Sequence, residues 1–317
     1  MPNNWPFWLA FLVFVAVMLA LDLGVFNRKA HVVKFKEALS WTALWISLAA
    51  AFAVLIYFFG HSFVGNEDRS NSVLMMEFIT GYLVEESLSV DNLFVFLLVF
   101  RYFKVPGQYQ HKVLFWGILG ALVMRAIFIF AGVALINRFH WVVYIFGAFL
   151  VLIGFRLLKQ DETEVNPEHN PVVRFFRKYV RLAPEYVGGK FVRIENGVRV
   201  ATPLLLVLAV VESTDVVFAV DSIPAILAIT REPFIVFTSN VFAILGLRSL
   251  YFALAGMMDL FHFLHYGLSG ILMFIGVKML GSHWFQIPIG LALGVVIGIL
   301  AISIGISVMF PAKKQPA

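Results

Sequence analysis

Two long apolar stretches of this chain carry acidic side chains with no basic residue beside them. The stretches Ser72 to Phe100 and Pro203 to Ile229 are otherwise as apolar as lipid-spanning helices, and they contain no Lys, Arg or His. Their acidic residues are Glu77, Glu85, Glu86 and Asp91 in the first stretch and Glu212, Asp215 and Asp221 in the second. Acidic groups that gather in an apolar segment without local bases favour a cation site.

Contact between these carboxylates and lipid would be too costly for a stable fold. One acidic side chain at mid-membrane costs roughly 2.5–3.5 kcal/mol, so the set without Glu77 would cost on the order of 15–20 kcal/mol. That sum exceeds the roughly 5–15 kcal/mol by which proteins are usually stable. We therefore expect the carboxylates to face the protein interior, a counter-charge, a cation or water.

The residue types in both stretches supply oxygen ligands. Asn92 and Ser222 directly follow Asp91 and Asp221. Carboxylate, amide, hydroxyl and carbonyl oxygens suit hard divalent ions such as Mn²⁺, Mg²⁺ or Ca²⁺. All eight His residues lie at or near the ends of apolar segments, which argues against an imidazole-rich Zn or Ni site, and the absence of Cys excludes thiolate sites and thiol chemistry.

The spacing of the acids does not fit one face of a straight helix. Glu85 and Asp91 are six residues apart, as are Asp215 and Asp221, and six residues turn an α-helix by about 600°. Ser, Thr, Asn and Pro residues near both pairs are helix-capping or helix-breaking types. We predict that both helices are interrupted there, so that freed carbonyl groups join the carboxylates. The alternative is a straight helix whose acids pair with neighbouring groups.

A small set of polar side chains is expected to balance or gate the acids. Arg125 and Arg248 lie inside apolar segments, where they would neutralise two acids or occupy the vacant site. The alternative is buried ion pairs with no role in transport. Arg101 and Arg231 lie near opposite membrane faces, either as gates or as side chains that extend to the interface. Asn240 lies eight residues before Arg248 and belongs to the same candidate set.

The two acidic stretches also resemble each other in sequence. Residues 88–93 align with residues 218–223, and the same offset places Glu85 over Asp215. We predict a duplicated three-helix unit. The alternative is chance similarity between apolar helices.

The elements that position these residues are membrane spans. With 61% hydrophobic and 14% charged residues and a mean hydropathy of +0.89, the chain is too apolar for a soluble globule. Its bases lie in short connections without interleaved aromatics, so nucleic acid is not an expected partner. We predict an all-α polytopic membrane protein in the lipid bilayer, with nine transmembrane helices. The predicted spans are 5–26, 41–60, 72–100, 111–136, 141–158, 200–230, 233–255, 262–280 and 287–310.

The distribution of charge predicts the orientation of the spans. The first, third and fifth connections and the C-terminal tail are basic, which places the N-terminus outside and the C-terminus in the cytoplasm. Spans three to five and six to eight then form inverted repeats, a symmetry typical of transporters with a mid-membrane site. The predicted parts are two N-terminal helices (1–71), the first repeat (72–158), a cytoplasmic loop (159–199), the second repeat (200–281) and a ninth helix with a basic tail (282–317). Asp22, at the end of the first span, is either an interfacial cap or a functional group.

Several motifs are similar to those of a known family. They are Gly81-Tyr82-Leu83-Val84-Glu85 with Leu88-Ser89-Val90-Asp91-Asn92, the run from Glu212 to Ile226, and the run from Thr238 to Arg248. Over nearly the whole chain the sequence resembles the TerC/Alx family of bacterial integral membrane proteins, and Tyr144 to Leu150 is similar to the Alx branch. The resemblance implies an inner-membrane protein linked to manganese efflux, alkaline response and tellurite resistance.

The resemblance also implies a set of metal ligands. They would be Glu85, Asp91, Asn92, Glu212, Asp215, Asp221 and Ser222. Glu86 stands where the Alx branch is expected to have a Lys, which leaves its role and the charge of the site open. An acidic pocket would repel oxyanions, so tellurite resistance does not follow from these residues.

These observations favour a secondary transporter that exports a divalent cation, Mn²⁺ foremost, in exchange for protons carried by the same carboxylates. No Walker-type phosphate loop indicates ATP coupling, and neither enzymatic activity nor a tightly bound cofactor is expected. An intramembrane aspartyl protease would fit two Asp residues that share a proton, but its Tyr-Asp and Gly-x-Gly-Asp signatures are missing. A further alternative is a non-transporting partner for metal loading or assembly of exported proteins, or a tellurite-resistance component, which would bind other proteins through residues 159–199.

Overall fold

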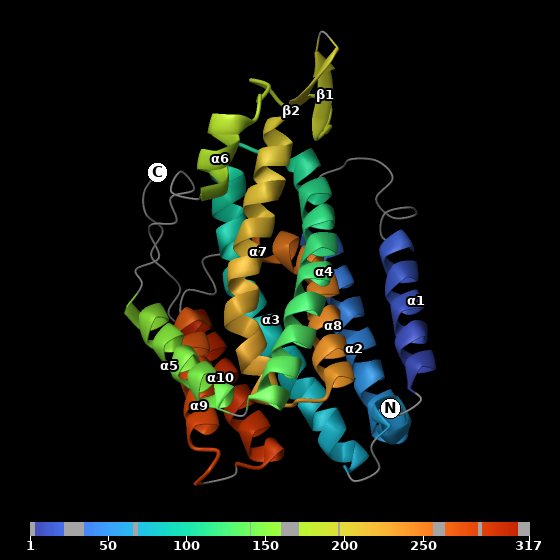
Figure 1. Ribbon diagram of the computed structural model, residues 1–317, viewed down its shortest axis with the longest axis vertical. Coiled ribbons are helices and arrows are strands. Elements are labelled where there is room, and N and C mark those ends of the chain that lie inside the picture. Colours follow the sequence, from blue (N-terminus) through green and yellow to red (C-terminus); the bar gives the residue numbers. More distant parts are fainter. Residues whose placement is uncertain are drawn as a thin grey trace.

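The computed structural model describes residues 4–21, 35–65, 69–139, 141–159, 171–195, 197–255, 264–284 and 287–309. The side chains of Asp91 and Asp221, and all of Asp22, lie outside the described part. Figure 1 shows long helices that run side by side, with a small hairpin at one end. The helices are α1 (Trp5–Leu21), α2 (Phe35–Val64), α3 (Asn71–Tyr102), α4 (Gly107–Arg138), α5 (Val142–Lys159), α6 (Pro171–Tyr179), α7 (Pro203–Leu227), α8 (Pro233–Ala255), α9 (Leu264–Leu280) and α10 (Ile289–Met309), and the strands are β1 (Val192–Glu195) and β2 (Val198–Ala201).

The structure confirms an all-α membrane protein. Within the described residues, α2, α4, α7, α8 and α10 are long and apolar enough to cross a bilayer. α1, α5 and α9 are apolar but shorter. Each of the nine predicted spans corresponds to one helix, whereas α6 and the hairpin were not predicted.

The predicted interruption of the two acidic helices is wrong. α3 runs without a break from Asn71 to Tyr102, and α7 runs from Pro203 to Leu227 with Pro224 inside its last turn. The polar residues that suggested a break bond back to their own helix instead. Ser87 Oγ donates to the Leu83 carbonyl at 2.5 Å, and Ser213 and Thr214 both donate to the Val210 carbonyl at 2.8 Å. Such bonds to the preceding turn let Ser and Thr stay inside a helix.

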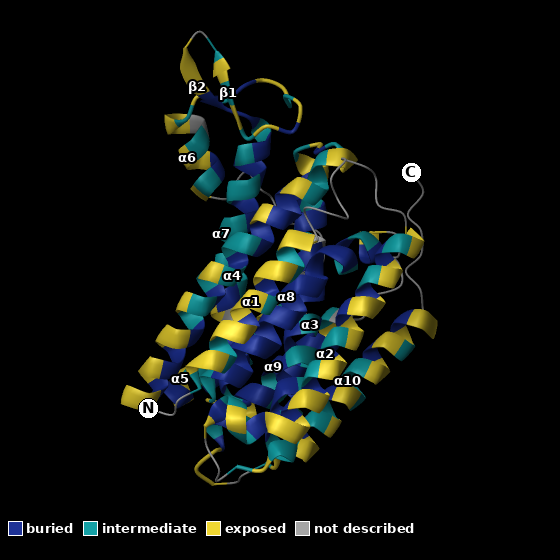
Figure 2. Ribbon diagram, turned by 90° about the vertical axis from the view of Figure 1, so that its right-hand side faces the viewer, coloured by how far each residue is buried: buried dark blue, intermediate teal, exposed yellow. Residues whose placement is uncertain are grey.

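The helices interlock across the middle of the bundle. α3 packs chiefly against α8, α7 packs against α4, and α5 packs against α9. α8 is the most enclosed of these helices, and it is dark blue along its length in Figure 2. A cluster of aromatic rings holds α2 and α3 against α8. In this cluster the Phe242 ring centroid lies 5.0 Å from that of Phe52 and 5.9 Å from that of Phe78.

Glycine allows α5 and α9 to approach each other closely. A Cβ on Gly276 would lie 2.7 Å from the Gly147 carbonyl oxygen and 2.9 Å from the Val151 nitrogen. One end of the pair joins Gly147 to Gly276, and the other joins Gly154 to Ser269, whose hydroxyl donates to the Gly154 carbonyl. The two contacts run in opposite order along the chain, so the helices are antiparallel. Small residues permit such backbone contact between membrane helices.

The segment before α7 is folded onto the ends of α3 and α4. The Tyr186 hydroxyl donates to the Phe103 carbonyl at 2.6 Å, and Lys112 Nζ donates to the Gly189 carbonyl at 2.7 Å. The Thr202 hydroxyl donates to the Lys190 carbonyl at 2.6 Å just before α7 begins. β1 and β2 form an antiparallel hairpin that turns between Glu195 and Val198. Residues 181–202 therefore form a cap on this end of the bundle.

Substitution of Gly276 tests the α5–α9 contact. We expect Gly276→Ala to force the helices apart because backbone atoms, which cannot rotate away, would meet the new methyl group. The expected loss is about 1–3 kcal/mol, measured by thermal or denaturant unfolding of the purified protein. Gly294→Ala on α10 is the matched control, because its Cβ would meet nothing within 4 Å. Equal stability of the two variants would contradict the close contact.

Substitution of Tyr186 tests the docking of the cap. Burial raises the pKa of Tyr186 to about 12, above the value of about 10 for a free tyrosine. The contribution of this side chain to stability is therefore present below pH about 10, and it is lost as the pH rises towards about 12. We expect Tyr186→Phe to expose residues 181–202 to trypsin at neutral pH, whereas Tyr144→Phe, at an exposed position on α5, should not. Equal cleavage of both variants would exclude this anchoring role.

Candidate functional site

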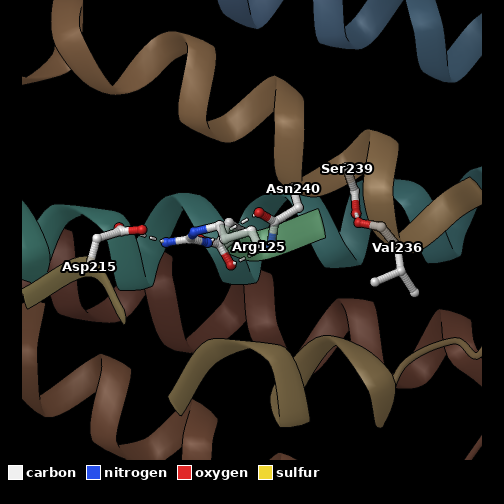
Figure 3. Close-up of polar contacts among 6 residues, drawn as sticks. Arg125, Asp215, Val236, Ser239 and Asn240 are labelled. Atoms are coloured by element: carbon white, nitrogen blue, oxygen red, sulfur yellow. Dashed lines mark hydrogen bonds and ion pairs between the residues drawn. The ribbon is translucent and has the colours of Figure 1, made fainter. Parts of the chain in front are cut away.

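Four buried polar residues from four helices meet in the middle of the bundle. They are Glu85 on α3, Arg125 on α4, Asp215 on α7 and Asn240 on α8, and their residue exposures are 0%, 2%, 5% and 0%. Figure 3 shows the guanidinium of Arg125 between Asp215 and Asn240. We call these four residues the central cluster. Each of the four helices contributes one side chain to the central cluster.

Arg125 holds the central cluster together. Its Nη1 forms an ion pair with Glu85 Oε1 and donates to Asn240 Oδ1 at 3.2 Å. Its Nη2 lies 3.4 Å from Asp215 Oδ1. The Asn240 amide in turn donates to Glu85 Oε2 at 3.1 Å. Carboxylates from both acidic stretches therefore converge on one guanidinium.

The central cluster is incompletely balanced in charge and hydrogen bonding. Two carboxylates, when ionised, face one guanidinium, which leaves a formal charge of −1. Asp215 Oδ2 is buried and has no hydrogen-bond partner among the described side chains, and the same holds for the hydroxyls of Ser89 and Ser222. Buried polar atoms are normally paired, so unpaired oxygens call for an explanation such as an ion or water. Carboxylate and hydroxyl oxygens are the ligand atoms that hard cations prefer.

Helix periodicity places these oxygens in two stripes. On α3, Glu85, Ser89 and Asn92 follow at steps of four and three residues, so they share one face. On α7, Glu212 and Asp215 are three residues apart, and Ser222 follows seven residues later on the same face. Each stripe extends from the central cluster past the position of an aspartate whose side chain is not described.

Glu212 lies against the backbone of α4. A Cβ on Gly120 would overlap both carboxylate oxygens of Glu212. Gly120 is five residues before Arg125, so this carboxylate contacts α4 more than one helical turn away from Arg125. The absence of a side chain at position 120 creates the space that the carboxylate fills.

The remaining candidates lie apart from the central cluster. A Cβ on Gly246 of α8 would lie 4.0 Å from Glu86 Oε1 and 3.6 Å from the Trp45 Cβ, which places Glu86 on the α2 side of α3. Arg248 is buried, whereas Arg101 and Arg231 are exposed. The proposed gating by these two exposed arginines stays a prediction.

The described side chains do not form a complete metal site. Among them, no group of three or more His, Cys, Asp or Glu is close enough to hold a metal ion. Arg125 stands between Glu85 and Asp215, where such an ion would have to lie. In the described arrangement, the positive charge beside the two carboxylates is thus the guanidinium of Arg125.

A second polar group, which we call the end cluster, was missed from the sequence. Glu77 on α3 is 3% exposed, pairs with Arg69 and accepts a hydrogen bond from the Thr230 hydroxyl at 2.7 Å. Arg69 Nη1 also lies 3.5 Å from Glu232 Oε1. The end cluster joins the α2–α3 connection to the α7–α8 connection. The only signal in the sequence was an acid without a base on its own helix.

The fold and the central cluster define a polytopic helical membrane protein with a charged interior. The chain belongs to the TerC family, since the model of the integral membrane protein TerC family matches residues 70–315. It is 51% identical over 297 residues to the uncharacterized membrane protein STKORF319 of Myxococcus xanthus, which covers 94% of this chain and 90% of that protein. No solved structure matches the chain at a significant level.

Another relative has a name that suggests a role. A protein of Escherichia coli strain K12 is 47% identical over 298 residues, covering 93% of this chain and 92% of that protein. Its name, Alx, proposes a membrane-bound redox modulator. An uncharacterized membrane protein of Rickettsia bellii is 37% identical over 302 residues, covering 95% of this chain and 97% of that protein. The resemblance to the TerC/Alx family is thereby confirmed.

Removal of the central guanidinium tests the electrostatics of the cluster. We expect Arg125→Gln to lower the free energy of unfolding by roughly 3–5 kcal/mol, because it leaves buried carboxylates without their counter-charge. The double variant Arg125→Gln with Glu85→Gln should recover much of the loss. Unfolding of the purified protein measures this, with the exposed Arg231→Gln as control. A stable single variant would show that the carboxylates are not charged as inferred.

Proposed function

We propose that the protein is a secondary transporter that exports a divalent cation, most favourably Mn²⁺, across the cytoplasmic membrane. The observation that supports this most is the convergence of Glu85 and Asp215, from two separate acidic stretches, on one buried position. Such buried carboxylates within membrane-spanning helices are typical of ion pathways. Their oxygen atoms suit Mn²⁺ as a substrate.

The proposal includes an inverted repeat, in which spans three to five (α3 to α5) and spans six to eight (α7 to α9) are the two copies. The pairing of α3 with α8 mirrors that of α7 with α4, and α5 lies antiparallel to α9. Under the alignment of the two acidic stretches, Glu85 corresponds to Asp215, and both contact Arg125. This is the arrangement expected if two opposed copies share one site at their interface. Nine spans, an external N-terminus and a cytoplasmic C-terminus complete the proposed topology.

In the proposed cycle Arg125 and the cation compete for the same carboxylates. When no ion is bound, the guanidinium pairs with Glu85 and Asp215 and prevents repulsion between them. An arriving cation takes its place, and protons carried by the carboxylates compensate charge on the return step. The proposed ligands are Glu85, Asp91, Asn92, Glu212, Asp215, Asp221 and Ser222.

The proposal also assigns a place to the end cluster. With the predicted orientation, Arg69 and Glu77 lie on the outer side of the central cluster. Eight residues of α3 separate Glu77 from Glu85, a rise of about 12 Å. Release to the outside would require the ion pairs of Arg69 with Glu77 and Glu232 to part. Neither an enzymatic step nor a tightly bound cofactor is involved.

Measurement of Mn²⁺ tests the transport proposal directly. Cells that make the wild type should hold less cytoplasmic Mn²⁺ than cells that make Asp91→Asn, Asp215→Asn or Asp221→Asn. Glu185→Gln, at an exposed position outside the spans, is the matched control and should behave as the wild type. Liposomes with a panel of divalent ions at two pH values identify the ion and the proton coupling. Equal accumulation in all cells at equal protein levels would remove the transport claim.

A substitution at Gly120 tests the role of Glu212. The added methyl of Gly120→Ala must displace the Glu212 carboxylate, and we expect Mn²⁺ affinity to fall by about tenfold, as for groups that support a metal site. Gly294→Ala should leave affinity unchanged. Titration of the purified protein with Mn²⁺ gives both values. Unchanged affinity in folded Gly120→Ala would remove Glu212 from the site.

A second candidate is a membrane partner that acts on other proteins without transport. The exposed side chains of Val192 and Ile194 favour it, because they lie on the same face of the hairpin and present an apolar surface outside the bundle. The redox role in the Alx name would have to work without thiol chemistry here, since the chain has no Cys. The variant Val192→Ser with Ile194→Ser separates the two candidates. If this variant loses function in cells, and if the wild type does not transport ions into liposomes, the partner role is favoured.

A further inference from the structure

The short helix α6 has one face held by the bundle. Val173 is fully buried, and Phe176 packs against the same apolar cluster, which includes Phe100 of α3 and Leu204 of α7. These contacts fix the orientation of α6 relative to the ends of the long helices. The opposite face of α6 therefore points away from the bundle in a fixed orientation.

The opposite face of α6 combines aromatic and basic side chains. Phe175 is 54% exposed and Tyr179 is 65% exposed, and their ring centroids are 5.1 Å apart. Arg174 and Lys178 are exposed beside them, and Lys178 Nζ lies 5.2 Å from the centroid of the Tyr179 ring. The helix sequence contains no acid. We call this surface the α6 outer face.

The position of α6 is that of the edge of a membrane. Figure 2 shows α6 beside the first turns of α7, while the hairpin extends farther from the bundle. Since α7 is long and apolar enough to cross a bilayer, its end marks the approximate level of the lipid headgroups. α6 is thus held where aromatic side chains are enriched in membrane proteins.

The charge of the surrounding segment matches an anionic membrane surface. Residues 171–202 contain seven basic and two acidic residues, a formal charge of +5. Basic clusters next to membrane spans attract anionic lipids, and the long side chains of Arg and Lys can reach phosphates while their stems cover apolar surface. Phe and Tyr together with Lys and Arg are also the composition of helices that lie in the interface.

We propose that the α6 outer face is a docking surface for the anionic headgroups of the bilayer that the protein spans. Phe175 and Tyr179 enter the headgroup region, and Arg174 and Lys178 bind lipid phosphates. This contact holds α6 at the membrane surface and leaves the hairpin of the following cap, Val192 to Ala201, in water. The proposal requires only that the protein spans a membrane and is independent of transport.

A label at a single cysteine tests the proposal, because the chain contains no cysteine of its own. An environment-sensitive fluorophore is attached to Phe175→Cys in the full-length protein, reconstituted in nanodiscs of phosphatidylcholine with or without phosphatidylglycerol. We expect the emission to shift to the blue with phosphatidylglycerol and to return towards the aqueous value at high salt. The same label at Ile194→Cys on the hairpin should report water in both lipids.

Neutralisation of single charges gives the matched control. In the labelled protein, Lys178→Gln should lower the ratio of docked to free segment about fivefold, the change expected for one basic group at a membrane surface. Arg199→Gln removes an equal charge from the exposed face of the hairpin and should have a much smaller effect.

Three results would overturn the proposal. The first is a label at position 175 that reports water in nanodiscs with phosphatidylglycerol. The second is equal shielding in both lipids, which would mean that phosphate charge is not recognised. The third is shielding that appears only after a cell extract is added, which would assign the α6 outer face to a protein partner.

Discussion

Two carboxylates and one guanidinium are buried together in a structure that offers them little other polar contact. Desolvation makes each of these charges costly, so none is stable in its position without the others. Glu85, Arg125 and Asp215 come from three different helices, and Asn240 on a fourth bonds to two of them. The relative positions of α3, α4, α7 and α8 are therefore coupled through one set of charges. A cation that displaced Arg125 would act on all four helices at once.

Close packing of the surrounding helices makes this coupling possible. Gly120 admits the Glu212 carboxylate beside α4, and Gly147 and Gly276 bring the backbones of α5 and α9 into contact. Aromatic rings pack around α8, so closely packed apolar side chains surround the central cluster. The end cluster adds a second link, in which Arg69 joins two connections that are distant in sequence. The central cluster and the end cluster thus each link segments that are distant in sequence through charged side chains.

The helices and the burial of the acids were accessible from the sequence, whereas most contacts were not. Hydropathy placed α3 within two residues of its observed ends, because a long apolar run has few alternatives to a helix in a bilayer. The predicted breaks failed because Ser and Thr can bond to the preceding turn as well as cap a helix end. The ion pair of Glu85 with Arg125 spans 40 residues and the contact of Arg125 with Asn240 spans 115, so periodicity alone does not reveal them. The sequence of α6 and the hairpin predicts a polar loop instead, because it contains few apolar residues and these form only short runs.

The most direct measurement is a structure determined with Mn²⁺ present, in which anomalous scattering locates the metal. The account predicts a peak between the carboxylates of Glu85 and Asp215, with the guanidinium of Arg125 moved away from both. A peak elsewhere, with Arg125 still bridging the two carboxylates, would contradict the claim that cation and guanidinium compete for one site.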